Sequence, residues 1–176
     1  MSTKRQSVWA LCASALALIS GAVSAQLLTI PAGYVTLYLG TGVRSSAVVD
    51  AATAVHCTTY TLDPDPSTTL YPFDIVIQFY GNTGALSAPV GLLTINQPDE
   101  TRTIATQETQ LYNEDENNLS LPLDQGSVRI AVPKKHAANT ICEADVLSKA
   151  NPPVFTRQVN LNRVGPKLKR LKDRFE

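Results

Sequence analysis

Histidine side chains are the first candidates for acid–base or nucleophilic chemistry in this chain of 176 residues. The two histidines are His56 and His136. A Ser-His-Asp hydrolase needs a histidine between a serine and a carboxylate, and no GxSxG motif accompanies either histidine. His56 lies in the middle of a predicted strand, and His136 follows a Pro-Lys-Lys turn. We therefore expect no catalytic residue, with His56 in a surface or packing role and His136 in a solvated loop.

An N-terminal export signal is indicated by positive charge followed by an apolar run. Lys4 and Arg5 precede this run, which closes with the small residues of a cleavage site at 23–25. We predict a cleaved signal peptide over residues 1–25 and a secreted or periplasmic protein that has no transmembrane span after cleavage. The alternative is an uncleaved membrane anchor, for which the serines, alanines and single glycine of the run are poorly suited.

The cysteines predict a disulfide. Cys12 leaves with the signal peptide, so Cys57 and Cys142 remain as one pair. Disulfides persist in exported proteins, and we therefore predict a Cys57–Cys142 bond. A tetrahedral zinc site would need further ligands, and the sequence has no CxxC or HxxxH spacing to supply them. We expect no transition-metal site and no other cofactor.

Two acidic segments offer carboxylate oxygens, the ligands that calcium prefers. They are Asp-Pro-Asp-Pro at 63–66 and Asn-Glu-Asp-Glu-Asn at 113–117. Neither fits the spacing of an EF-hand loop. The weak calcium candidates are Glu114, Asp115 and Glu116. The alternative for both segments is a solvated turn.

The elements that must position these residues are predicted strands. Apolar residues recur with period two, and Thr, Val, Ile, Tyr and Phe fill segments that Pro, Gly, Asn and Asp separate. Gly-Asn-Thr-Gly at 81–84 predicts a hairpin, and Pro-Asp-Glu at 98–100 predicts a turn. The seven predicted strands span 33–40, 53–60, 73–80, 90–95, 101–106, 126–132 and 139–147.

Alternation along these strands assigns side chains to opposite faces. The residues predicted to be buried are Ile75, Ile77, Phe79, Val128, Ile130, Cys142 and Val146. The residues predicted to be exposed are Arg129, Glu143 and Asp145. Both cysteines fall on apolar faces. The prediction is an all-β protein with a single antiparallel β-sandwich of about seven strands and one disulfide, over residues 26–160.

The strand and turn segments carry a resemblance. AVHCTTY, IVIQFYGNTGAL, TRTIATQ, QGSVRIAV, ICEADVL and NPPVF resemble small exported bacterial β-sandwich proteins of uncharacterised function, with an immunoglobulin-like or fibronectin-III-like fold. The match covers about residues 48–160. It implies a fold and a compartment and transfers no catalytic or binding residue. The tryptophan found in the core of true immunoglobulin domains is missing.

Charge divides the chain near its C-terminal end. Residues 26–156 have 6 basic and 13 acidic side chains, whereas residues 157–176 have 7 basic and 2 acidic ones. Within a basic amphipathic tail at 161–176, Pro166–Phe175 has helical spacing. The predicted contact residues are Lys167, Lys169, Arg170, Lys172 and Arg174. They could meet the acidic domain, an anionic lipid surface or an acidic protein, or could form a solvated end. The acidic body predicts no nucleic-acid binding.

These features favour an exported, non-enzymatic interaction or structural module of the cell envelope or extracellular space. A hydrolase or small-ligand-binding protein whose site is built from loops is the alternative. A subunit of a surface polymer that exchanges strands is a further alternative, based on the apolar segment at 27–31. An enzyme predicts a pocket where reactive groups converge, whereas an interaction module predicts shallow surfaces and exposed strand edges.

Overall fold

The computed structural model describes residues 30–46, 51–60, 71–106, 116–118, 123–148 and 154–167. The predicted signal peptide and the tail beyond Lys167 lie outside these residues. No helix in the described part of the chain is long and apolar enough to cross a membrane.

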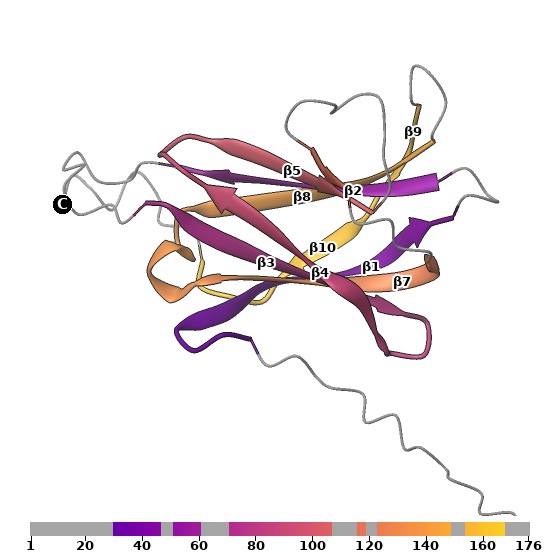
Figure 1. Cartoon of the computed structure of the whole chain (residues 1–176), viewed down its shortest axis with the longest axis horizontal. Helices are drawn as coiled ribbons and strands as arrows, with labels where there is room; N and C mark the ends of the chain where they lie inside the picture. Colours follow the sequence, from indigo (N-terminus) through magenta and orange to yellow (C-terminus); the bar gives the residue numbers. More distant parts are fainter. Residues whose placement is uncertain are drawn as a thin grey trace, which may run out of the picture.

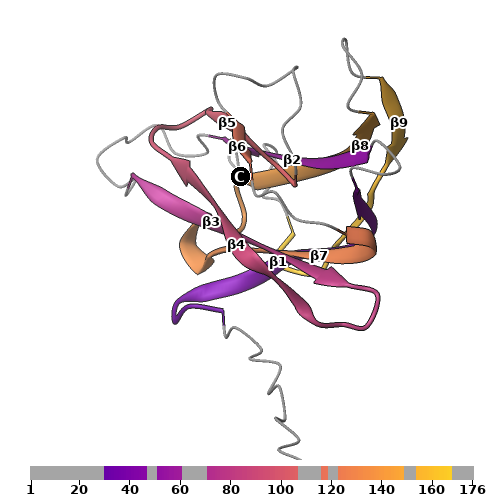
Figure 2. The ribbon, with the colours of Figure 1, turned by 45° about the vertical axis from the view of Figure 1, so that its right-hand side comes forward.

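Two five-stranded sheets pack face to face and form the predicted β-sandwich (Figures 1 and 2). Sheet A has the order β10-β1-β7-β3-β4, and sheet B has the order β6-β5-β2-β8-β9. All neighbouring strands are antiparallel except β5 and β6, which run parallel. The strands are β1 (Tyr34–Ser45), β2 (Ala51–Thr59), β3 (Phe73–Gly81), β4 (Leu86–Ile95), β5 (Thr101–Ala105), β6 (Glu116–Asn118), β7 (Leu123–Pro133), β8 (Thr140–Ser148), β9 (Phe155–Gln158) and β10 (Asn160–Arg163).

All seven predicted strands are present, and three further strands were not anticipated. The additional strands are β6, β9 and β10, which have only three or four residues each. Such short edge strands contain too few residues for a period-two pattern, and Glu-Asn-Asn or Asn-Leu-Asn-Arg has no apolar alternation. Edge position explains their polarity, because one side of an edge strand faces solvent.

The C-terminal strands close one side of the sandwich. β9 pairs with β8 in sheet B, and the chain then crosses to sheet A, where β10 pairs with β1. Val159 lies at the crossing, is 3% exposed and donates its N–H to Ala144 O at 2.7 Å. The predicted domain boundary after residue 160 therefore falls within β10, and the sheet continues to Arg163.

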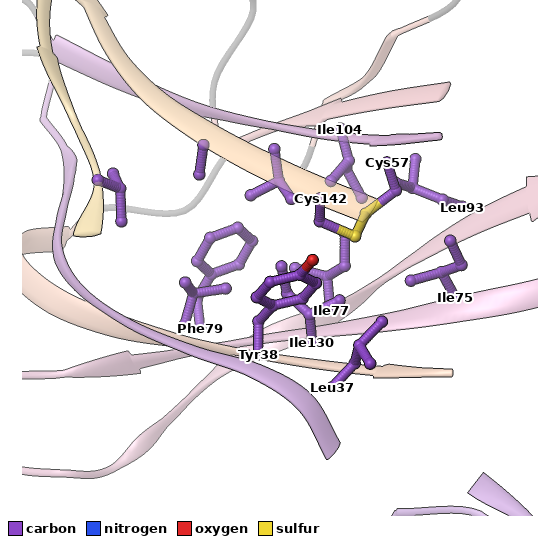
Figure 3. Packing of buried hydrophobic residues seen from close by; sticks show 14 of the residues in the cluster. Leu37, Tyr38, Cys57, Ile75, Ile77, Phe79, Leu93, Ile104, Ile130 and Cys142 are labelled. Atoms are coloured by element: carbon purple, nitrogen blue, oxygen red, sulfur yellow. A yellow bond between two sulfur atoms is a disulfide. The ribbon is translucent and has the colours of Figure 1, made fainter. Parts of the chain in front are cut away.

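The core lies between the two sheets and consists of inward-facing aliphatic and aromatic side chains (Figure 3). Phe79, Ile77 and Ile130 come from sheet A, and Val55 and Ile104 come from sheet B; all five are fully buried. All seven side chains predicted to be buried are buried. The period-two interpretation therefore identifies the inward faces of β3, β7 and β8.

Two of the three side chains predicted to be exposed are instead half-buried. Glu143 is exposed, but Arg129 and Asp145 are only partly so. Arg129 lies along the outer face of sheet A and donates from Nε to Gln78 Oε1 at 2.6 Å. Asp145 lies beside the His56 ring on the outer face of sheet B. Neighbouring strands shield both side chains from solvent. The alternation within one strand does not show which residues of the neighbouring strands lie beside a side chain.

Truncation of an inward side chain should cost far more stability than truncation of an outward one. We expect Ile77→Ala to lower the free energy of unfolding by about 2 to 5 kcal/mol, because it leaves a cavity between the sheets. Glu143→Ala should change it by less than about 0.5 kcal/mol. Chemical denaturation of both variants measures the difference, and equal losses would contradict the facing assignment.

Candidate functional site

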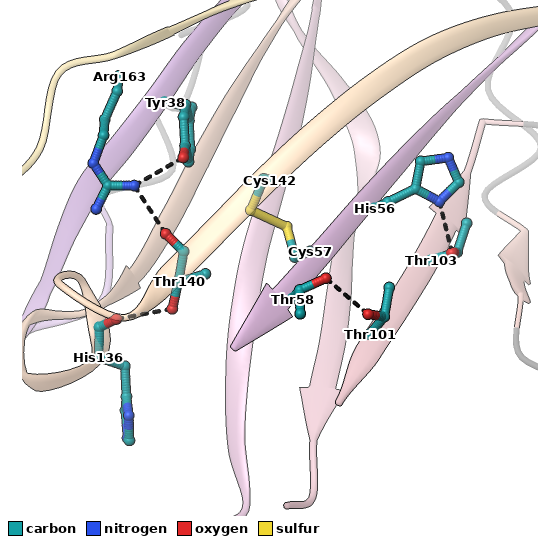
Figure 4. The surroundings of a disulfide bond; sticks show 10 residues. All are labelled: Tyr38, His56, Cys57, Thr58, Thr101, Thr103, His136, Thr140, Cys142 and Arg163. Carbon is teal, nitrogen blue, oxygen red and sulfur yellow. Dashed lines mark hydrogen bonds between the residues drawn. A yellow bond between two sulfur atoms is a disulfide. The ribbon is translucent and has the colours of Figure 1, made fainter. Parts of the chain in front are cut away.

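The predicted Cys57–Cys142 disulfide is present (Figure 4). The two residues are directly opposed on β2 and β8, with Cα atoms 4.1 Å apart, and both are buried. The bond therefore joins neighbouring strands within sheet B. In immunoglobulin domains the disulfide joins the two sheets, so the immunoglobulin-like part of the sequence resemblance gains no support from the position of this bond.

His56 has polar neighbours from two other strands on the outer face of sheet B. Its Nδ1 atom forms a hydrogen bond of 2.8 Å with Thr103 Oγ1 on β5 (Figure 4). Its Nε2 atom lies 3.9 Å from Asp145 Oδ2 on β8, and Glu143 is its direct cross-strand partner. We call His56, Thr103, Glu143 and Asp145 the His56 cluster.

Burial and charge act against each other in the His56 cluster. Burial lowers the pKa of His56, and the carboxylates of Asp145 and Glu143 partly oppose that shift. Burial raises the pKa of Asp145; the charge of His56 opposes this shift, and Glu143 adds to it. Both shifts favour the neutral forms of the two groups.

The His56 cluster has the residue types of a hydrolytic triad but not its geometry. The 3.9 Å separation of His56 Nε2 and Asp145 Oδ2 exceeds hydrogen-bond distance. Thr103, which would have to act as the nucleophile, is only 7% exposed. The alternation within a single strand gives no indication of these neighbours. The pairing of β2 with β5 and β8 brings them together.

The prediction of a solvated loop for His136 is wrong. His136 ends the short 3₁₀ turn η2 (Lys134–His136), is 4% exposed and stacks on Phe73, with ring centroids 3.8 Å apart and planes inclined by 7°. Its carbonyl oxygen accepts a hydrogen bond from Thr140 Oγ1 at 2.8 Å. The turn folds the ring over the end of the core, so His136 has a packing role.

Arg163 is a structural residue that the sequence analysis counted only as tail charge (Figure 4). Its Nη1 group donates to Tyr38 Oη and to Thr140 O, both at 2.8 Å. Its Nε donates to Pro166 O at 2.7 Å, and its Nη2 donates to Ala137 O. This guanidinium connects β10 with β1 and with the turn before β8.

The predicted contact tail is only partly visible. Lys167 is exposed. The other predicted contact residues, Lys169, Arg170, Lys172 and Arg174, lie outside the described residues, so their role stays a prediction. Two other basic residues of the C-terminal segment, Arg157 and Arg163, make hydrogen bonds within the sandwich.

The calcium hypothesis also stays a prediction. Glu114 and Asp115 lie outside the described residues, and Glu116 begins β6. Among the residues whose positions are described, no group of three or more His, Cys, Asp or Glu side chains could hold a metal ion.

The outer face of sheet A has an ordered polar network between exposed leucines. Gln78 Oε1 accepts hydrogen bonds from Arg129 Nε at 2.6 Å and from Tyr80 Oη at 3.2 Å. The Arg129 guanidinium lies 5.6 Å from the centre of the Tyr80 ring. Leu39 pairs with Arg129 across β1 and β7, and Leu92 lies on the edge strand β4; their exposed fractions are 46% and 49%. We call these five residues the sheet A patch.

Two shallow hollows are present in the described part of the surface. One, of about 320 Å³, lies between β8 and the crossing from β9 to β10, with Glu143 as its only charged lining residue. The other, of about 510 Å³, lies where β1, the β3–β4 hairpin, the start of β7 and β9 meet. Its polar lining consists of Thr41, Arg44, Asn82, Gln125, Ser127 and Arg157. We call it the arginine hollow.

Comparison of the chain with protein-family models, curated proteins and solved structures gave no match. Functional assignment therefore depends on the geometry of the surfaces and side chains described above.

Removal of the disulfide should destabilise the fold strongly. The bond closes a loop with a sequence separation of 85 residues, and the chain-entropy model gives roughly 4 to 5 kcal/mol for a loop of that length. We expect a loss of this order for the Cys57→Ala, Cys142→Ala double variant in chemical denaturation. Addition of a reductant should destabilise the wild type and leave the double variant unchanged. A wild type that is insensitive to reduction would contradict the prediction.

Acid should destabilise the protein partly through His56. Its folded pKa lies below the unfolded value of about 6.5, so the unfolded state binds a proton more readily as the pH falls through that value. Between about pH 7.5 and pH 5.5, wild type should therefore lose more stability than His56→Asn, which does not titrate. The Asp145→Asn control should lose more than wild type, because it removes a carboxylate that favours protonated His56. Parallel pH profiles for wild type and His56→Asn would refute this role.

Proposed function

We propose that this protein is an exported, non-enzymatic interaction module that binds a partner protein through the sheet A patch. The observation that carries the proposal is the pre-ordered Arg129–Gln78–Tyr80 network between exposed Leu39 and Leu92. Arginine and aromatic side chains beside apolar groups are typical of protein interfaces. Side chains held by hydrogen bonds before association lose less conformational freedom on binding.

In the register of sheet A, the residues of the patch lie on neighbouring strands. Leu39 on β1 is opposite Arg129 on β7, and Arg129 is opposite Gln78 on β3. Leu92 on β4 is opposite Val76, the outward neighbour of Gln78 along β3. The patch thus extends over four adjacent strands. Gln78 is 1% exposed although it lies on the outer face, because neighbouring side chains cover it.

The disulfide supports export as part of the proposal. Cysteine pairs are kept reduced in most cytosolic compartments, and a buried structural bond is typical of secreted or periplasmic proteins. This argument and the signal peptide predicted at residues 1–25 support the proposed location in the cell envelope or extracellular space.

The two alternative functions have weaker support. For a hydrolase, the His56–Thr103 hydrogen bond is a favourable contact, but the buried Thr103 is poorly placed to attack a substrate. For a strand-exchanging subunit, the long edge strand β4 contains Pro89, which lacks a backbone N–H, and its register with β3 shifts between Ile77 and Phe79. Proline and irregular pairing reduce the capacity of an edge to accept another strand.

Site-specific photo-crosslinking tests the proposed contact surface. A photoreactive residue at position 92 should give a defined adduct with an envelope or extracellular protein from the source cells. The same residue at position 154 is the matched control, because Val154 is similarly exposed but lies beside sheet B. Excess wild-type protein should compete the adduct away. The Arg129→Glu variant should compete poorly, because it loses the bond to Gln78, whereas Lys135→Glu should compete like wild type.

Failure of the proposal would be visible in the same experiment. Equal adducts from positions 92 and 154, no adduct from position 92, or equal competition by Arg129→Glu and Lys135→Glu would each refute the sheet A patch as the contact surface.

A further inference from the structure

We propose that the arginine hollow binds an oxyanion, either a carboxylate or a phosphate or sulfate group, carried by a small polar ligand. This site is separate from the sheet A patch in function, and anion binding there does not require the proposed protein partner. The hollow has a volume of about 510 Å³, within the range of small-molecule sites.

The charge of the lining is the first argument. Arg44 and Arg157 both line the hollow, and its described lining contains no carboxylate. Among the described residues, neither arginine forms an ion pair. Both arginines line the same hollow of a domain whose residues 26–156 contain more acidic than basic side chains. Attraction of an anion would therefore be a local property of this hollow rather than of the whole surface.

The guanidinium of Arg157 and the backbone of Arg44 are held by the fold. Arg157 Nη2 donates to Gly42 O at 2.6 Å, although the two residues are 115 positions apart in the sequence. The backbone of Arg44 is fixed to Thr53: its N–H donates to Thr53 Oγ1 at 2.9 Å, and its carbonyl accepts from the same hydroxyl at 2.7 Å. In the described structure, Arg44 Nε is buried and has no hydrogen-bond partner. An arriving anion would therefore meet a pre-formed positive site with unused donor capacity.

Two glycine residues of the hollow occupy backbone positions that other residues fit poorly. Gly42 has φ +93°, a left-handed conformation that favours glycine, and it lies at the register shift of the β1–β7 pairing between Thr41 and Val43. At Gly126, a Cβ atom would lie only 2.3 Å from Tyr80 O, so no other residue fits the close approach of β3 and β7. The N–H groups of Gly81 and Gly84 are used within the hairpin turn. These two N–H groups are therefore not available as donors to a ligand.

The remaining polar lining suits a ligand larger than a bare ion. Asn82 and Gln125 supply amide groups, and Thr41 and Ser127 supply hydroxyl groups. These groups can donate to or accept from hydroxyl groups of the ligand. The guanidinium groups would bind the oxyanion by charge-assisted hydrogen bonds, which are stronger than neutral ones.

Titration of the full-length exported protein with acetate, inorganic phosphate and sulfate tests the site. The readout is the NMR signal of the Nε–Hε group of Arg44 and of Arg157. Chloride at equal ionic strength is the reference. We expect saturable shifts of both arginine signals with at least one oxyanion and no saturation with chloride. The acetate arm identifies a carboxylate site, and the phosphate and sulfate arms identify a site for tetrahedral esters.

Charge variants at the two ends of the sandwich separate binding from folding. Gln125→Glu places a carboxylate in the hollow and leaves the Arg157–Gly42 bond untouched, so we expect affinity to fall about tenfold or more. Gln97→Glu makes the same change in the exposed turn at the opposite end and should bind within about twofold of wild type. The Arg44→Gln, Arg157→Gln double variant should not saturate. Identical shifts with chloride, or equal binding by Gln125→Glu and Gln97→Glu, would overturn the proposal.

Discussion

The pairing of β2 with β8, fixed by the Cys57–Cys142 bond, is the constraint from which the rest of sheet B follows. The two cysteines are directly opposed, so the bond is compatible with one register of these strands. In that register Val55 faces the core opposite Ala144, and His56 faces outward opposite Glu143. A shift of one residue would exchange the two faces and place charged groups in the core. The covalent bond and the hydrophobic alternation thus specify the same arrangement.

The C-terminal strands complete the sandwich by joining its two sheets. β9 extends sheet B and β10 extends sheet A, with the buried Val159 between them. Arg157 and Arg163 then connect distant segments through hydrogen bonds to carbonyl and hydroxyl oxygens. Removal of residues 157–176 would therefore take away part of the fold as well as the basic tail. Two of the basic residues at 157–176 therefore hold the fold together, and a count of charges along the sequence does not distinguish them from the rest of the basic tail.

The two outer faces of the sandwich present different chemistry. On sheet B, Thr103 and two carboxylates lie around His56, and burial lowers the pKa of its ring. On sheet A, an arginine, a glutamine and a tyrosine form a network beside exposed leucines. The first arrangement explains how polar groups are satisfied on a half-buried face. The second provides apolar and polar contact area that a partner can use.

The sequence by itself determined the all-β class, the seven longer strands, the inward faces of β3, β7 and β8 and the disulfide, because period-two alternation and the pairing of two cysteines are local or compositional signals. Only the tertiary structure decided which strands are neighbours. It therefore brought Thr103 and Asp145 to His56, His136 onto Phe73, and Arg157 to Gly42. Alternation tells which face of a strand is buried but carries no information about the partner across the sheet. The arginine hollow and the bonds of Arg163 depend on residues brought together by long-range pairing, and no spacing in the sequence indicates them.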